Sequence, residues 1–121
     1  MERGDGFTIL HRDDMERTGN WLLARRSLGV GAFGINLVEI PPGEAIPEHA
    51  EVERDQEEVF CVLEGGATIV IDGEEHPAPA GTLARLDPPR RRTVRNDGDV
   101  PALVLIVSAP RTSGYEPMAW A

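Results

Sequence analysis

From residue 31 onward, short apolar runs alternate with polar positions and are separated by turn-forming residues. A period of two is typical of strands that bury one face. We therefore expect strands at residues 33–40, 58–63, 67–71, 82–86, 92–95 and 102–107. The connections between them are rich in Gly, Pro, Asn and Asp, as at residues 41–43 and 96–98, and such residues reverse the chain. The pattern predicts an antiparallel sandwich or barrel.

The first 30 residues are less regular. Residues 7–10 predict a short strand, and Asp13 and Glu16 have the spacing of a capping box for a brief helix. Residues 21–28 fit neither the helical nor the strand period and could form either. We divide the chain into an N-terminal extension at 1–30 that packs on the barrel, the barrel at 31–110, and a tail at 111–121.

Charge and composition narrow the function. The 121 residues carry a net charge of −9, from 21 acidic and 12 basic side chains, so nucleic acid and anionic membranes are not expected partners. All the basic residues are arginine, which excludes a lysine Schiff base. The single cysteine, Cys61, cannot form an intramolecular disulfide. The N-terminus does not resemble a secretory signal, and the longest apolar stretch is too short for a bilayer. We expect a soluble, cytoplasmic protein.

Three residues are candidates for chemistry at one site. Strand alternation places Glu58, Phe60 and Val62 on one face, and a carboxylate on an interior face needs a partner. His49 and Glu51 lie two residues apart, so in extended chain their side chains point the same way. The turn-rich segment before Glu58 could return them beside it. One imidazole and two carboxylates suit a divalent metal such as Mn, Fe, Ni or Zn, with open positions for a substrate.

The spacing of these residues resembles the two motifs of the cupins. Gly43 is followed after five residues by His49, and Glu58 after six residues by Gly65. Gly73, Pro79, Gly81 and Asn96 match the second motif in order and spacing. The resemblance covers residues 40–96 and implies an all-β fold, the double-stranded β-helix or jelly-roll barrel, with a short helical or strand segment before it.

Two positions depart from the cupin pattern. Glu51 stands where the second histidine of the first motif is expected, and Arg92 stands at the position of the final histidine. Arginine offers only donors and cannot ligate a metal. Arg92 could pair with Glu58 or Glu51, or hold a substrate carboxylate in a bidentate fork. The site is thus either a metal centre at His49, Glu51 and Glu58 or a metal-free polar pocket.

The resemblance implies a bacterial metabolic enzyme of the isomerase, lyase or oxygenase type that acts on a small anionic molecule. We expect Glu58 and His49 to be catalytic, and Arg92 and Phe60 to contact the substrate. The alternative is a metal-free cupin that binds or senses a small molecule without changing it. The resemblance also implies a homodimer.

The remaining candidates are weaker. His11 is the one further histidine that could join the site, while His76 falls in a predicted turn. Cys61 lies out of phase with Glu58 on its strand, which is typical of a buried, unreactive thiol. The acidic run at residues 51–58 lacks the glycine of a calcium loop.

Overall fold

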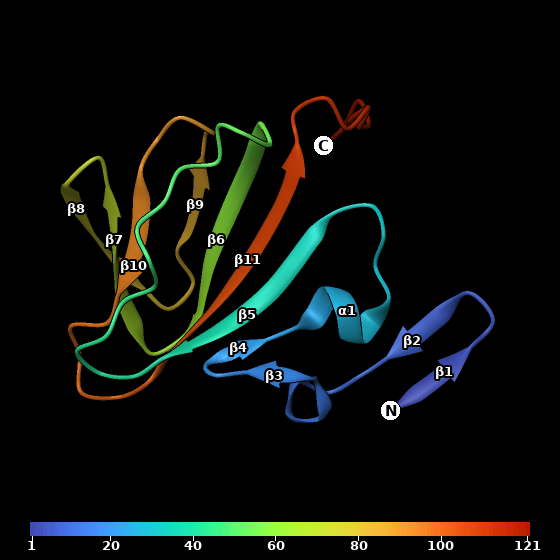
Figure 1. Ribbon diagram of the computed structural model, residues 1–121, viewed down its shortest axis with the longest axis horizontal. Coiled ribbons are helices and arrows are strands. Elements are labelled where there is room, and N and C mark those ends of the chain that lie inside the picture. Colours follow the sequence, from blue (N-terminus) through green and yellow to red (C-terminus); the bar gives the residue numbers. More distant parts are fainter.

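A computed structural model describes residues 1–121 and is nearly all β. The larger sheet has the strand order β3-β4-β5-β11-β6-β9, and the smaller has the order β10-β7-β8. Every pairing is antiparallel, as predicted. The larger sheet contains β3 (Arg17–Thr18), β4 (Trp21–Leu22), β5 (Gly34–Ile40), β11 (Ala102–Pro110), β6 (Gln56–Glu64) and β9 (Leu83–Leu86). The smaller contains β10 (Arg92–Arg95), β7 (Gly66–Ile71) and β8 (Glu74–Pro79). The two sheets face each other in the jelly-roll arrangement (Figure 1).

The main core lies between the two sheets. Alternate residues of β6 and β10 point into it, so Phe60, Val62 and Val94 are fully buried while their sequence neighbours are partly exposed. Twelve buried apolar residues form this one cluster. The strand alternation inferred from the sequence is therefore confirmed for the face that carries Glu58.

A second, smaller cluster covers part of the outer face of the larger sheet. Residues 21–28, which the sequence allowed to be either helix or strand, contain one of each: the strand β4 is followed by the short helix α1 (Ala24–Leu28). Leu22 and Ala24 pack there on Leu37 and Leu103. The helix ends at Gly29, whose φ of +77° suits glycine and whose amide donates to the carbonyls of Arg25 and Arg26.

The connection from β5 to β6 leaves the larger sheet and runs along β10. His49 and Arg92 exchange backbone hydrogen bonds of 3.0 and 2.8 Å, and the Ile46 amide donates to the carbonyl of Val94 at 3.1 Å. The hydroxyl of Thr93 donates to the Ile46 carbonyl at 2.6 Å. Because the connection is held as if it were one more strand, it carries His49 and Glu51 to the face where Glu58 points.

Two predictions of local structure need correction. The strand β8 was expected to be a turn, because its sequence is polar and contains two prolines; it is an edge strand whose single buried side chain is Ala78. The brief helix predicted from Asp13 and Glu16 is a 3-10 turn, Arg12–Asp14 (η1), and its cap is the His11 side chain, which accepts from the Asp13 amide.

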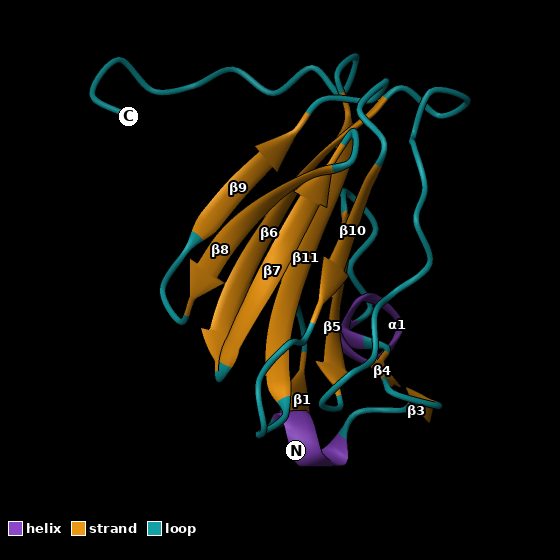
Figure 2. Ribbon diagram, turned by 90° about the vertical axis from the view of Figure 1, so that its left-hand side faces the viewer, coloured by secondary structure: helices purple, strands orange, loops and turns teal.

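The ends of the chain extend away from the two sheets. The strands β1 (Glu2–Gly4) and β2 (Phe7–Ile9) form a separate hairpin that buries no side chain. The tail at residues 111–121 is exposed throughout and projects from the far end of the molecule (Figure 2). No helix has both the length and the apolar character that crossing a membrane requires.

Candidate functional site

Glu58 is the most buried carboxylate of the candidate site. It lies on β6, opposite Leu86 of β9 and Ser108 of β11, and its side chain is 8% exposed. Its Oε1 accepts a hydrogen bond of 3.1 Å from Nε of Arg92. Nη2 of Arg92 lies 3.1 Å from the same oxygen. A buried carboxylate thus has the cation that its burial requires.

Arg92 is held on every side by the protein. Its side chain is 0% exposed, and Nη1 donates to the carbonyls of Asp87, Pro88 and Arg90 at 3.2, 3.3 and 2.6 Å. Nη2 is close enough to Glu58 for an ion pair but is not aligned for a hydrogen bond, and it is the one buried side-chain polar atom without a hydrogen-bond partner. Of the two roles expected for Arg92, the structure shows the pairing with Glu58.

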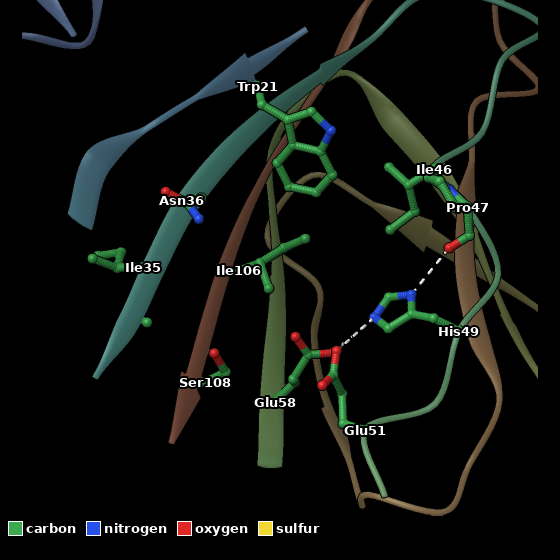
Figure 3. Close-up of a pocket in the computed structure, with 11 residues that line it drawn as sticks. Trp21, Ile35, Asn36, Ile46, Pro47, His49, Glu51, Glu58, Ile106 and Ser108 are labelled. Atoms are coloured by element: carbon green, nitrogen blue, oxygen red, sulfur yellow. Dashed lines mark hydrogen bonds and ion pairs between the residues drawn. The ribbon is translucent and has the colours of Figure 1, made fainter. Parts of the chain in front are cut away.

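His49 faces both carboxylates (Figure 3). Its Nδ1 lies 3.0 Å from the carbonyl oxygen of Pro47, which can only accept, so Nδ1 donates. Its Nε2 lies 3.3 Å from Oε1 of Glu51 and 3.4 Å from Oε1 of Glu58. These contacts are long for hydrogen bonds. The three residues proposed from the sequence are brought together.

The surroundings of His49 favour a positively charged group at Nε2. With Nδ1 committed to Pro47, the lone pair of a neutral ring would point at two carboxylates, which is unfavourable. A proton on Nε2 removes the conflict, and so would a divalent cation. Ligand atoms of His49, Glu51 and Glu58 lie within 4.8 Å of one another.

The same three residues fit a divalent metal in their donor chemistry. A metal-bound histidine usually donates its other ring N–H to a carbonyl or carboxylate, as Nδ1 does to Pro47. Two carboxylates and one imidazole suit Mn, Fe or Zn. Arg92 occupies Oε1 of Glu58, so Oε2, which accepts no hydrogen bond in the chain, is the oxygen left for a ligand.

A pocket of about 320 Å³ opens over these residues. Its apolar wall is formed by Trp21, Ile46 and Ile106, and Asn36 and Ser108 add polar groups. His49 and Glu51 expose 33% and 25% of their side chains, so both are accessible to a small molecule. The pocket has the mixed lining that is typical of small-molecule sites.

Two residues expected to contact a substrate do not line this pocket. Phe60 is fully buried in the core between the sheets, and Arg92 lies behind Glu58. Strand alternation assigns a residue to the interior face, but it does not distinguish the pocket from the packed core beside it. Phe60 is therefore a core residue, and Arg92 can act on the pocket only through Glu58.

Sequence reasoning did not identify Trp21, Asn36 and Ser108 as pocket residues. Trp21 reaches the site because β4 pairs with β5, opposite Val38, and a two-residue strand gives almost no periodic signal. The alternation along the predicted strands at 33–40 and 102–107 could have placed Asn36 beside the interior face, but it could not show which neighbours bound the cavity.

The other singled-out residues lie elsewhere. His11 is exposed at the start of η1 and is not among the pocket residues, so it does not join the site. His76 is an exposed residue of β8. Cys61 is partly buried on the opposite face of β6 from Glu58.

Fold and site together define a small antiparallel jelly-roll protein with an acidic pocket between its sheets. A family model described as "Cupin domain" matches residues 36–108. The chain therefore belongs to the cupin family.

Three relatives illustrate the range of similarity. A curated relative, the tetracenomycin polyketide synthase protein TcmJ of Streptomyces glaucescens, is 27% identical over 89 residues; the match covers 74% of this chain and 58% of TcmJ. A cupin structure from Bacteroides fragilis superposes with a TM-score of 0.78 at 22% identity, over 95% of this chain and 92% of that one. A cupin-superfamily sugar phosphate isomerase from Silicibacter pomeroyi gives 0.75 at 28% identity, over 84% and 75% of the chains.

Proposed function

We propose that this cupin is a small-molecule enzyme that moves a proton within its substrate, as an isomerase does. The observation that carries the proposal is the contact of one imidazole nitrogen, Nε2 of His49, with the carboxylates of both Glu51 and Glu58 at the floor of the pocket. Three titratable groups in contact can accept a proton at one point and return it at another.

Each residue has a distinct role in this proposal. Glu51 is the more exposed carboxylate and takes the proton from a carbon next to a substrate carbonyl; the C–H electron pair moves toward the carbonyl oxygen, and an enolate forms. Nε2 of His49 passes a proton between Glu51 and Glu58. The Glu58 carboxyl group then returns this proton to a different carbon of the substrate. Arg92 holds the Glu58 carboxyl group in place through the hydrogen bond to Oε1, and is a positioning residue.

A divalent metal fits the same residues. When bound at His49, Glu51 and Glu58, it would polarise a substrate oxygen and so favour loss of the neighbouring proton. The protein would still supply the pocket and the orientation of the three side chains through Arg92 and the Pro47 carbonyl.

One comparison supports this class of chemistry. The relative from Silicibacter pomeroyi is described as a sugar phosphate isomerase. The chain spans little more than half the length of TcmJ, so a role in polyketide chemistry is a weaker extrapolation. Within this proposal the protein is a bacterial, cytoplasmic enzyme of metabolism.

A second candidate is a metal-free cupin that binds a small molecule without changing it. The observation that favours it is the complete enclosure of Arg92, which neutralises Glu58 without any metal. A pocket that is stable in this form can serve recognition alone. The two candidates differ in whether a bound molecule exchanges hydrogen with water.

The discriminating experiment is solvent exchange in D₂O. Purified protein is incubated with a panel of hydroxy ketones, aldoses and 2-oxo acids, each with and without a phosphate group, and NMR follows deuterium entering carbon positions. We expect exchange to fall by 10²–10⁴-fold in Glu51→Gln, Glu58→Gln and His49→Ala, the usual contribution of an acid or base. Glu48→Gln is the matched control, because that exposed carboxylate pairs with Arg91. Binding of panel members with no exchange would favour the second candidate.

We also propose that the protein forms a homodimer. The hairpin of β1 and β2 buries nothing within the chain, and isolated two-stranded hairpins are marginal in water. Phe7 and Ile9 project from it. Sedimentation equilibrium of the full chain and of a chain lacking residues 1–10 tests this. The full chain should be a dimer and the truncated chain a monomer; the same number of subunits in both would contradict the role of the hairpin.

A further inference from the structure

Most arginines of this acidic protein are paired with carboxylates. Of its twelve arginines, nine lie within 4.0 Å of an aspartate or glutamate oxygen. The three that do not are Arg3, in the N-terminal hairpin, and Arg25 and Arg54. With 21 acidic residues in the chain, an unpaired arginine is the exception and calls for an explanation.

Arg25 and Arg54 line the same cavity although they are far apart in sequence. Arg25 lies on α1, and Arg54 lies on the connection that leads into β6 (Figure 1). The cavity between them measures about 500 Å³ and is lined mainly by polar groups, among them Gln56. Nη1 of Arg25 donates to the Val30 carbonyl at 3.1 Å, which restrains that side chain at the cavity.

This second cavity adjoins the pocket of the candidate site. Four residues, Gly34, Asn36, Glu51 and Ser108, line both. Gly34 carries no side chain at this boundary, and the Glu51 carboxylate is directed to Nε2 of His49 at 3.3 Å. A molecule can therefore extend from the titratable groups of the first pocket to the two free guanidinium groups of the second.

We propose that the second cavity binds the terminal anionic group, a carboxylate or a phosphate, of the molecule whose reacting end lies at Glu51, His49 and Glu58. Guanidinium groups are well suited to both anions because their N–H donors match paired oxygens. This inference rests on the proposed function and adds to it the substrate class. The anionic group of the substrate is then bound by Arg25 and Arg54, and not by Arg92, which is enclosed.

The charge distribution gives the subsite a selective role. The first pocket presents the carboxylates of Glu51 and Glu58 and no accessible arginine, since Arg92 is covered by Glu58. An anionic group is repelled there and attracted to Arg25 and Arg54. A substrate that carries its charge at one end is thereby oriented, with its uncharged carbonyl end toward Glu51 and Glu58.

The direct test uses inorganic phosphate and acetate as probes and requires no turnover. NMR follows the Nε–H signals of the arginines during titration at constant ionic strength, in wild type, Arg25→Gln, Arg54→Gln and Arg3→Gln. Arg3→Gln is the matched control, because it removes an equally unpaired charge far from the cavity. We expect the dissociation constant for phosphate to rise about tenfold in Arg25→Gln and Arg54→Gln, and to stay within twofold in Arg3→Gln.

The titration also identifies the anionic group of the substrate. If phosphate binds more tightly than acetate, the terminal group is a phosphate; if acetate binds more tightly, it is a carboxylate. The proposal is overturned if neither anion moves the Arg25 and Arg54 signals, or if Arg3→Gln weakens binding as much as the other two variants, which would indicate general attraction to positive charge.

The exchange assay separates failure of this inference from failure of the proposed function. In Arg54→Gln, KM should rise for anionic panel members while kcat is retained, because a remote anion contact stabilises the ground state and transition state equally. Phosphate binding at Arg25 and Arg54 with no exchange on any panel member would refute the proton-transfer function and leave the subsite standing. Exchange with an unchanged KM in this variant would refute the subsite alone.

Discussion

Replacing Arg92 by methionine tests the most consequential contact of the site. The change removes the guanidinium beside a carboxylate that is 8% exposed. It also removes the side-chain donor to the carbonyls of Asp87, Pro88 and Arg90, of which only Asp87 and Pro88 keep a backbone amide donor. Breaking a buried ion pair by removing one partner typically costs about 3–5 kcal/mol. Methionine is similar in length to the arginine stem, so little of this loss arises from a cavity.

Urea unfolding at pH 7, followed by circular dichroism, measures this loss. With a slope of about 1.5 kcal/mol per molar urea, the midpoint should fall by about 2–3 M. The double variant Arg92→Met, Glu58→Leu should recover most of the lost stability, because it replaces the whole pair by apolar side chains. Arg85→Met is the control: it breaks an exposed pair with Asp87 and should cost about 0–1 kcal/mol.

Two results would show that Arg92 is not the stabilising partner of Glu58. A loss below about 1 kcal/mol in Arg92→Met would mean that Glu58 does not depend on its cation. Strict additivity of the Arg92 and Glu58 substitutions in the double variant would mean that the two side chains are not energetically coupled. If Arg92→Met fails to fold, the folded state of the double variant still provides the comparison.

Three further predictions concern the scaffold. Asn96→Ala should cost about 2–4 kcal/mol, because its buried amide donates to Ile40 and Val100 and accepts from the Gly98 amide; a urea midpoint close to that of the wild type would contradict this. Gly65→Ala should destabilise more than Gly73→Ala, since both have positive φ but only at Gly65 would a Cβ meet the Pro101 oxygen, at 2.5 Å; equal losses would exclude that clash. Hydrogen bonds from Arg90 and from the Arg91 amide hold the pKa of Asp72 below its ordinary value. The stabilisation by Asp72 is therefore complete above about pH 4 and lost as pH falls through the lowered pKa. In Arg90→Gln, the carboxyl ¹³C titration midpoint of Asp72 should move up, and an unmoved midpoint would show that Arg90 is not the cause.

The two sheets were largely predictable from the sequence because most of their strands bury one face. β6 and β10 alternate strictly, and glycine or proline marks the turns around them. β8 was missed because an edge strand with one buried residue, Ala78, carries no alternation. The hairpin strand β1 is exposed at every position and gives no apolar pattern either.

The three titratable residues of the candidate site were predictable, but the other pocket residues and the geometry were not. Motif spacing and the parity of His49 and Glu51 predicted convergence on Glu58, and the structure brings the three together. Alternation along β10 puts Arg92 and Val94 on one face, yet whether Arg92 lies in the pocket or behind Glu58 depends on the distance between the two sheets. No local pattern encodes that distance, and none pairs Arg25 with Arg54.

The proposed function depends on one arrangement: Nε2 of His49 connects two carboxylates while Nδ1 donates to the Pro47 carbonyl. NMR of ¹⁵N-labelled histidine tests this arrangement without a substrate, because long-range couplings identify which ring nitrogen carries a proton. We expect a protonated Nδ1, and an Nε2 resonance that shifts in Glu51→Gln and in Glu58→Gln but not in Glu48→Gln. An unprotonated Nδ1, together with an Nε2 signal that neither pocket substitution changes, would show that His49 does not connect the two carboxylates.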